Sequence, residues 1–406
     1  MPADKKPLPF GTPNVRLNSM EKFQALRGQA LLFLLFIWFL WFLSFTARTI
    51  FSPLLPLMED EFRISHATAA SLLTFIAFGY SLSLFLSGIF SGLLGLKKSI
   101  VLSMVGSSII FFVIPFLSAF HWLRLLAFTL GLTTGIYLPS IIPLITEYYH
   151  EKIWGKTIAI HDSAASLSIF AAPFIALFSL RFFPWKGIFV VLGSLSFLCG
   201  VLFFFVCKEV KTNRGKRPFL SDLIRRKPLW IMGILWIFAA GANLGLYFVF
   251  PLYLTKELRM DVESANTIFG LSRLGGIVVS ISAGFFVDRF SLKKITFFLV
   301  LTTGLLTIAL TTRDLGWLKV LLFLHAGIAV GFFPVALVSI SRVFNQDMRG
   351  QATGLIVTLG VIFGIGLIPY LLGLSGDLLS FRVGIFLLGA LTCLSSGLVY
   401  YLRELG

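Results

Sequence analysis

Long apolar stretches recur along the chain, and most of them are separated by short polar connections. A transmembrane α-helix needs about 20 predominantly apolar residues. Twelve stretches satisfy this requirement: residues 29–57, 68–93, 99–120, 122–147, 157–180, 186–207, 229–255, 264–287, 294–312, 317–343, 351–374 and 382–402. The pattern therefore predicts an all-α membrane protein with twelve transmembrane helices, in which the short connections make successive helices antiparallel neighbours.

One polar connection is much longer than the others and divides the twelve stretches into six and six. It covers residues 208–228 and is rich in lysine and arginine. The expected organisation is a polar tail over residues 1–28, a six-helix half over 29–207, the basic linker over 208–228 and a second six-helix half over 229–406. The first apolar stretch is long enough for a complete span, so it is read as a retained helix rather than as a cleavable signal peptide.

The composition excludes the common soluble classes. Hydrophobic residues make up 57% and charged residues only 13% of the chain, whereas soluble domains carry about 25% charged residues. An ordinary soluble enzyme, a disordered chain and a secreted disulfide scaffold are therefore excluded. The three cysteines lie in apolar stretches, which indicates neither a disulfide framework nor a metal site. No Walker loop or catalytic triad is evident in the sequence, so we expect no cofactor and no enzymatic activity.

The formal net charge of +16 at first suggests a nucleic-acid partner, but 45 phenylalanines in so apolar a chain argue against one. If the N-terminus is inside, 23 of the 34 lysines and arginines lie on inner segments, 9 on outer segments and 2 within spans. This positive-inside distribution predicts a multi-pass protein of a bacterial inner membrane, with both termini and the linker in the cytoplasm. The linker is read as a topology determinant, with contact to anionic lipid as the alternative.

The two halves repeat at an offset of 196 residues. Residues 88–98 end the second stretch with two lysines, and residues 284–294 end the eighth in the same way. Two glycines of the fourth stretch recur in the tenth, and each pair is followed by a proline and a further glycine (Gly131, Gly135, Pro139 and Gly155; Gly327, Gly331, Pro334 and Gly350). Since each half has an even number of spans, the repeat is parallel, and such transporters bind their substrate near the midplane between the halves.

The segment GFFVDRFSLKK at residues 284–294 resembles the inner-loop signature of the major facilitator superfamily. The resemblance extends over residues 29–402 and implies that superfamily's fold of two pseudo-symmetric six-helix halves. It also implies an inner gate in which Gly284 permits close helix packing, while Asp288 and Arg289 take part in charge interactions at a helix end. The N-terminal copy has Gly92 in place of the acid, so the expected gate is asymmetric.

Three charged residues, Arg48, Asp162 and Arg273, fall well inside predicted spans. A charge near the bilayer centre costs about 3 kcal/mol on insertion scales, so such residues usually mark a substrate or ion pathway. Arg273 lies about 15 Å into its helix, close to the midplane, on a stripe with Asn266 and Gly270. It is a candidate ligand for an anion, and the alternative is a structural arginine bonded to backbone carbonyls.

Arg48 is the second candidate cation and shares a helix face with Ser52. It precedes Pro56 by eight residues. In this respect the chain is similar to organophosphate:phosphate antiporters of the superfamily, which carry a substrate-binding arginine at that spacing, and related organic-anion symporters use an arginine in the same region. The resemblance implies that Arg48 binds an anion. The alternative is a gate or interface arginine whose long side chain reaches toward water.

The antiporters carry a second arginine eight residues before a proline in span 7, where this chain has Asn243 before Pro251. The loss of one cation disfavours a doubly charged phosphate ester. Asn243 shares a helix face with Trp236 and Tyr247. These residues are read as a polar and aromatic wall for a carboxylate-sized or amphipathic ligand, with a packed aromatic stripe as the alternative.

Asp162 follows His161 in the fifth stretch. A carboxylate beside an imidazole can carry a coupling proton, or it can form an inner-gate salt bridge. Resemblance gives proton coupling little support, because the arginine that symporters carry in span 4 is replaced by Ala127. Proton coupling, exchange against a counter-substrate and facilitated diffusion therefore all remain open.

Together these features predict a monomeric secondary transporter that moves a small organic anion, with a carboxylate favoured, by alternating access. Its partners would be the substrate, a coupling proton or counter-substrate, and the lipid bilayer. An exporter of an amphipathic or zwitterionic compound is the alternative within transport. A non-transporting receptor or assembly protein on the same fold is the alternative from another class.

Overall fold

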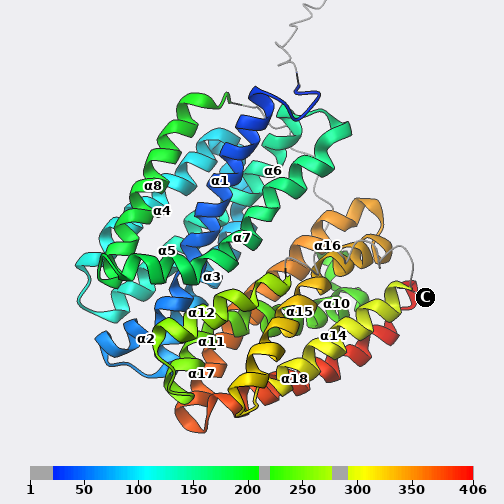
Figure 1. The fold of residues 1–406 in the computed structure, drawn as a ribbon. Coiled ribbons are helices and arrows are strands. Elements are labelled where there is room, and N and C mark those ends of the chain that lie inside the picture. Colours follow the sequence, from blue (N-terminus) through cyan, green and yellow to red (C-terminus); the bar gives the residue numbers. More distant parts are fainter. Residues whose placement is uncertain (1–21, 210–219, 277–290, 406) are drawn as a thin grey trace, which may run out of the picture.

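The computed structural model describes residues 22–209, 220–276 and 291–405, and nearly all of them are helical (Figure 1). Eleven helical runs within these residues are long and apolar enough to cross a membrane. The remaining predicted span, residues 264–287, is described only as far as residue 276. The prediction of an all-α membrane protein is confirmed.

The N-terminal half is built from α1 to α8, which lie at the upper left of Figure 1 except for α2, which lies at the lower left. Short 3₁₀ turns join some of these helices. The elements are α1 (Gln29–Thr49), α2 (Phe51–Phe62), α3 (His66–Leu94), α4 (Leu96–Val113), η1 (Ile114–Phe116), α5 (Phe120–Gly135), α6 (Tyr137–Tyr148), η2 (Glu151–Ile153), α7 (Trp154–Leu180) and α8 (Trp185–Val206).

The C-terminal half lies at the lower right of Figure 1 and differs from the first by three π-helical segments, η3, η4 and η5. Its elements are α9 (Leu220–Ile224), α10 (Lys227–Ala240), η3 (Gly241–Gly245), α11 (Leu246–Leu252), η4 (Tyr253–Glu257), α12 (Val262–Ser272), α14 (Leu292–Ala309), α15 (Leu315–Val343), α16 (Gln346–Leu359), η5 (Gly360–Leu367), α17 (Ile368–Leu378), α18 (Phe381–Ser396), η6 (Gly397–Tyr401) and η7 (Arg403–Leu405).

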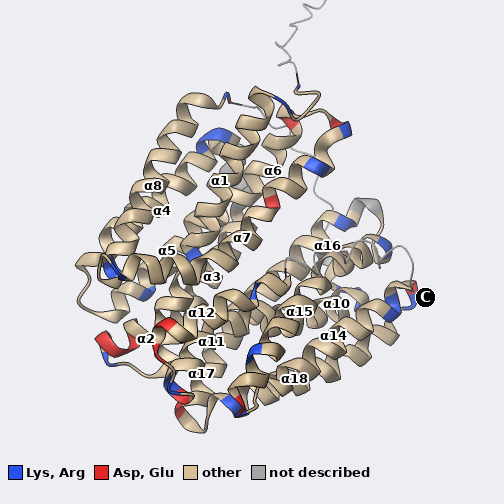
Figure 2. Ribbon diagram, in the orientation of Figure 1, with Lys and Arg blue, Asp and Glu red and all other residues tan. Residues whose placement is uncertain are grey.

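The first span is longer than the predicted 29–57, because α2 continues to Phe62 through three acidic residues. Their carboxylates are paired rather than exposed to lipid. Glu59 contacts His66 and Lys256, and Glu61 forms an ion pair with Lys186 at 2.7 Å. Figure 2 shows the acidic residues gathered at this end of α2, whereas the helix interiors are almost free of charge.

Close helix crossings occur at matching positions in the two halves. Gly79 on α3 and Gly131 on α5 each face the backbone of the other helix so closely that a Cβ atom would clash with it. In the second half, Gly275 lies against the backbone of α15 near Gly327. The offset of 196 residues relates Gly79 to Gly275 and Gly131 to Gly327. The repeat thus preserves a contact that only small residues allow.

Replacing Gly131 with alanine should lower the thermal stability of the purified protein, because the added methyl group forces α3 and α5 apart. Overpacking of this kind costs roughly 1–3 kcal/mol. Gly155 is the matched control, since a Cβ atom there meets nothing within 4 Å. Equal melting temperatures for Gly131→Ala and Gly155→Ala would contradict the close crossing.

Candidate substrate site between the two halves

The two ends of the helix bundle differ in how the halves meet. The linker end contains the start of α1, the end of α8 and the start of α10. The opposite end, which we call the closed end, contains the turns after α2, α7 and η4 and the turn between α17 and α18. In Figure 1 the halves approach one another at the closed end, where α2 lies near α11 and α12.

Charged side chains join the halves at the closed end. Lys256 on η4 contacts both Glu59 and Asp60 of α2. Glu59 also contacts the Nδ1 atom of His66 at 2.7 Å. Since the Glu59 side chain is only 9% exposed and Lys256 is 21% exposed, their charges are weakly screened and contribute more than an exposed pair would.

A second polar contact at this end involves the start of α3. The carboxylate of Asp377 on α17 accepts hydrogen bonds from the backbone N–H groups of His66 and Ala67, at 2.8 and 2.9 Å. These N–H groups begin a helix and have no partner within it. The second half therefore supplies the N-terminal cap for a helix of the first half.

Four further hydrogen bonds cross between the halves within the spans. Ser52 Oγ donates to Tyr247 O at 2.9 Å, and the Tyr247 hydroxyl donates to Ile169 O at 3.0 Å. The others are Asn266 Nδ2 to Pro53 O at 3.2 Å and Thr74 Oγ1 to Gly366 O at 2.7 Å. Ser52, predicted as a substrate contact, thus binds the backbone of the other half.

Between residues that the structure describes, no hydrogen bond or ion pair joins the halves at the linker end. Among the described residues, the polar contacts between the halves lie at the closed end and within the spans. The arrangement is therefore asymmetric along the bundle axis, as expected for one state of a protein whose halves separate at one end at a time.

Arg48 lies at the boundary between the halves, surrounded by aromatic rings. Its guanidinium carbon is 4.3 Å from the ring centre of Tyr80, 4.5 Å from that of Phe45 and 5.7 Å from that of Trp41. The Nε and Nη2 atoms are buried and have no hydrogen-bond partner among the described residues. The faces of the rings attract the cation, and the Tyr80 side chain also accepts a hydrogen bond from the guanidinium, but Nε and Nη2 stay without a partner.

A cavity of about 40 Å³ lies beside Arg48. Both halves contribute to its wall, which is otherwise apolar: Phe45, Leu73, Ile76, Ala77 and Tyr80 from the first half and Leu244, Phe248, Val361 and Ile365 from the second. A water-sized group occupies roughly 10–15 Å³ by this measure, so the cavity has room for the charged head of a small molecule next to the guanidinium.

Arg273 is also buried, with 6% of its surface exposed. It follows the last residue of α12, and its guanidinium carbon is 4.8 Å from the Tyr247 ring and 5.0 Å from the Phe269 ring. Its Nε atom has no hydrogen-bond partner among the described residues. The backbone-carbonyl bonding considered as an alternative for Arg273 is not seen there.

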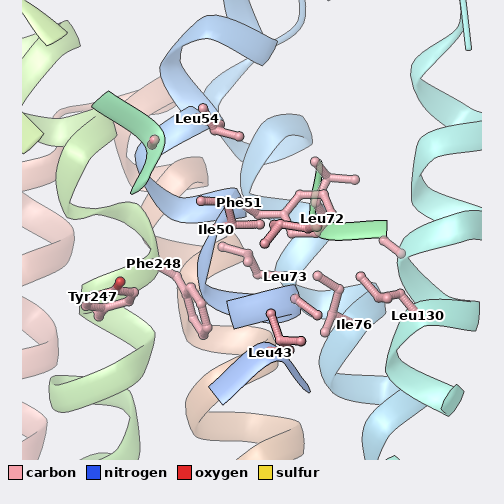
Figure 3. Close-up of a cluster of buried hydrophobic side chains, with 14 of the residues drawn as sticks. Leu43, Ile50, Phe51, Leu54, Leu72, Leu73, Ile76, Leu130, Tyr247 and Phe248 are labelled. Carbon is pink, nitrogen blue, oxygen red and sulfur yellow. The ribbon is translucent and has the colours of Figure 1, made fainter. Parts of the chain in front are cut away.

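The two arginines contact different residues of α11, so they do not share one cavity. Tyr247 contacts Arg273, whereas Phe248 lines the cavity beside Arg48. In Figure 3, Phe248 extends from α11 toward Leu73 and Leu43 of the first half, whereas Tyr247 lies on a different face of the same helix. The structure therefore places both cations next to α11 but does not bring Arg273 into the cavity of Arg48.

The other predicted wall residues are buried in the second half. Trp236 packs against Phe332 and Phe333 of α15 and lies over Gly360. Asn243 lies in the π-helical segment η3 and is 4% exposed, with no side-chain hydrogen bond to any described residue. Trp236 is thus part of a packed aromatic group, which is the alternative considered for these residues.

His161 is the first of three stacked rings that extend to Arg48, and Asp162 contacts its imidazole. Asp162 Oδ1 is 3.1 Å from His161 Nδ1, and His161 Nε2 is 3.4 Å from the Tyr137 hydroxyl. The rings of His161, Tyr137 and Trp41 are nearly parallel, and Trp41 faces Arg48. His161 is fully buried but the Asp162 side chain is 55% exposed, so the stack connects an accessible carboxylate with a buried cation.

Sequence reasoning did not identify Tyr80, the ring nearest to Arg48, although it is the only tyrosine in the apolar stretch 68–93. It also passed over His325, which is fully buried in α15 with Nε2 at 3.0 Å from Thr307 Oγ1. A polar ring within an apolar span was the available signal in both cases. The predicted gate residues Gly284, Asp288 and Arg289 lie outside the described residues.

The fold and the site define a class of membrane protein made of two repeated helical halves with a buried cationic site between them. A family model described as the Major Facilitator Superfamily matches residues 37–360 and 245–405. The chain belongs to this superfamily and is a secondary transporter rather than an enzyme.

Curated relatives are distant. The chain is 23% identical to a hexuronate transporter of Bacillus subtilis over 61% of either protein, so it spans less than two thirds of that relative. It is also 23% identical to a TsgA homologue of Buchnera aphidicola over 75% of this chain and 78% of that protein.

Solved transporter structures share the fold at low sequence identity. A bacterial homologue of the lysosomal transporter Spinster, in an inward-facing and unoccupied conformation, matches with a TM-score of 0.76 and 15% identity over 92% of this chain and 96% of that one. The D-xylose-proton symporter matches with a TM-score of 0.73 and 15% identity over 91% and 97%. These likenesses support the fold alone.

Replacing Lys256 with glutamine should loosen the closed end, because it removes the cation that faces Glu59 and Asp60. A cysteine introduced at Ser52, which is buried at the contact between the halves, should then react severalfold faster with a membrane-permeant maleimide in a background without the native cysteines. Arg181→Gln is the matched control, since its cross-half ion pair with Glu263 is 68% and 72% exposed and should contribute little. Equal labelling of the Lys256→Gln variant and the parent would contradict the prediction.

Proposed function

We propose that the protein transports a small organic anion, with a carboxylate as its charged group, by alternating access. The observation that carries this proposal is the buried guanidinium of Arg48, which lies beside a largely apolar cavity and whose Nε and Nη2 atoms have no hydrogen-bond partner among the described residues. An unpaired donor of this kind is costly in a low-dielectric site. A carboxylate satisfies two guanidinium donors at once, in parallel and with opposite charge.

Arg273 is proposed as the second cation, held against Tyr247 on the opposite side of α11. Ser52 and the Tyr247 hydroxyl fix α11 to the first half through hydrogen bonds. An anion that binds at Arg48 and attracts Arg273 would draw α11 toward the cavity and favour a state in which both ends are closed. The substrate therefore supplies the charge that makes closure favourable.

A chemical parallel supports an acidic substrate. The relative from Bacillus subtilis is described as a hexuronate transporter, and a hexuronate carries one carboxylate. We infer a monocarboxylate rather than a phosphate ester, because Asn243 supplies an amide in place of a further cation. An amphipathic or zwitterionic compound remains the competing substrate class, since the cavity wall is largely apolar.

We further propose that the linker end faces the cytoplasm of a bacterium and that the protein works as a monomer in the inner membrane. The excess of lysine and arginine on the predicted inner segments supports this orientation. With this orientation the closed end would face outward, and the two halves would separate toward the cytoplasm.

Replacing Arg48 or Arg273 with alanine should reduce uptake of a labelled hexuronate or similar monocarboxylate at least tenfold in proteoliposomes. Each change removes a charge-assisted hydrogen bond, and tenfold corresponds to about 1.4 kcal/mol. Arg124→Ala is the matched control, because Arg124 also faces aromatic rings, those of Phe75 and Phe120, but lies away from the cavity.

Reconstituted amounts and melting temperatures show whether each variant is folded. Unchanged uptake by both folded variants would exclude the site. Uptake of neutral amphipathic compounds by the parent, without any effect of Arg48→Ala, would favour the competing substrate class.

A specific contact favours proton coupling through Asp162. The half-exposed carboxylate can exchange protons with water, and the stacked rings of His161, Tyr137 and Trp41 connect it to the surroundings of Arg48. If a proton accompanies the anion, protonation at low external pH should promote accumulation. Loss of the proton in the higher-pH interior should then promote release.

Asp162→Asn should abolish accumulation driven by a pH gradient but retain exchange of labelled for unlabelled substrate, because exchange needs no net proton movement. Ser163→Ala is the neighbouring control, since Ser163 bonds Trp38 rather than the ring stack. Gradient-driven accumulation that survives in Asp162→Asn would remove this carboxylate from coupling and favour a counter-substrate.

A further inference from the structure

A second cavity lies on the outer surface of the first half, away from the boundary between the halves. It has a volume of about 700 Å³ and runs between the start of α1 and the end of α8 at the linker end. The lining residues are Phe23, Gln29, Leu32, Phe33, Phe36, Tyr148, Leu202, Val206 and Lys208. We call this cavity the α1–α8 groove.

The groove has apolar walls and a polar rim. Leu32, Leu202 and Val206 are 68%, 51% and 53% exposed, so the walls open onto the surface that the bilayer covers. Gln29 and Lys208 lie at the helix ends, where a membrane helix meets the headgroup region. The groove is therefore apolar where the acyl chains of a bilayer lipid lie and polar where its headgroup lies.

The walls of the groove are fixed by hydrogen bonds and ring stacking. The Phe23 backbone bonds to the end of α6, with its N–H to Tyr148 O at 2.9 Å and its C=O to His150 N at 3.0 Å. The rings of Phe33 and Tyr148 stack at 4.7 Å. The Lys208 N–H donates to the Tyr148 hydroxyl at 2.7 Å. These contacts hold Phe23, Phe33, Tyr148 and the Lys208 backbone in place along one part of the groove.

The rim is positively charged. The Lys208 side chain is exposed and makes no ion pair with any described residue, and the exposed Arg27 lies two residues before Gln29. The start of α1 has no side-chain cap and adds the partial positive charge of a helix N-terminus. The carboxylate of the neighbouring Glu209 lies at the start of α4, where it accepts a hydrogen bond from Lys97 N at 3.2 Å.

From this geometry we propose that the α1–α8 groove binds one anionic phospholipid from the membrane leaflet at the linker end. The headgroup phosphate contacts Lys208 and Gln29, and an acyl chain lies along Leu32, Phe36 and Leu202. Basic pockets between transmembrane helices are suited to lipid headgroups. The lipid is a bound partner of the first half and not the transported solute.

The test uses the full-length protein, equilibrated in detergent with equal amounts of phosphatidylglycerol and phosphatidylcholine of the same acyl composition. Native mass spectrometry then measures retained lipid. We expect phosphatidylglycerol to be retained in preference, and Lys208→Gln to lower its retention about fivefold, the contribution of one lysine near an anionic membrane surface. Lys319→Gln is the matched control, because Lys319 is exposed at the closed end and makes no ion pair with any described residue.

Leu202→Trp tests the acyl part of the groove and should lower the retention of both lipids, with an unchanged melting temperature. A photoreactive amino acid at position 32 identifies the occupant directly by the mass of its cross-linked adduct. A lipid adduct supports the proposal, whereas an adduct to another part of this chain or to a second protein overturns it.

Two further results would also overturn the proposal. In one, the parent retains equal amounts of the two lipids, and Lys208→Gln does not change these amounts. The other is displacement of phosphatidylglycerol by millimolar glycerol phosphate, which would indicate a site for a soluble anion. Both are independent of substrate transport, so failure here leaves the proposed role of Arg48 and Arg273 untouched.

Discussion

An unpaired guanidinium between two apolar walls is the interaction on which the functional architecture depends. Removing a cation from water is costly, and Arg48 recovers part of that cost from the ring faces of Tyr80, Phe45 and Trp41 and from a hydrogen bond to the Tyr80 side chain. The surrounding helices therefore hold a site that is satisfied best by an anion, and the closest rings come from α1 and α3, which pack at the boundary with the other half.

The contacts between the halves are asymmetric along the bundle, and this asymmetry bears on how the site at Arg48 is reached. Partly buried ion pairs and the Asp377 cap join the halves at the closed end. No described pair joins them at the linker end. Under the proposed function, separation at one end and closure at the other would expose the site at Arg48 to one side of the membrane at a time, as alternating access requires.

The features that could be predicted from the sequence are those that depend on a short stretch of the chain. Helix existence follows from the length of apolar runs, so the spans were found, and the expected burial of Arg48 and Arg273 inside the protein followed from the cost of placing charge in lipid. The position of Trp236 in the core and the separation of the arginines by Tyr247 and Phe248 depend on how α11 is rotated. That rotation depends on packing between residues far apart in the chain, which no local pattern contains.

The three π-helical segments make the two halves mechanically unequal although their sequences repeat. All three lie in the seventh and eleventh spans, where η3 and η5 pack through Gly241, Gly245 and Gly364. A π-helical turn is much rarer than an α-helical one and is often found at functional sites. The two halves would then move differently relative to each other. The first half would rotate as a rigid body, whereas the helices of the second half would bend at the π-helical segments around the bound solute.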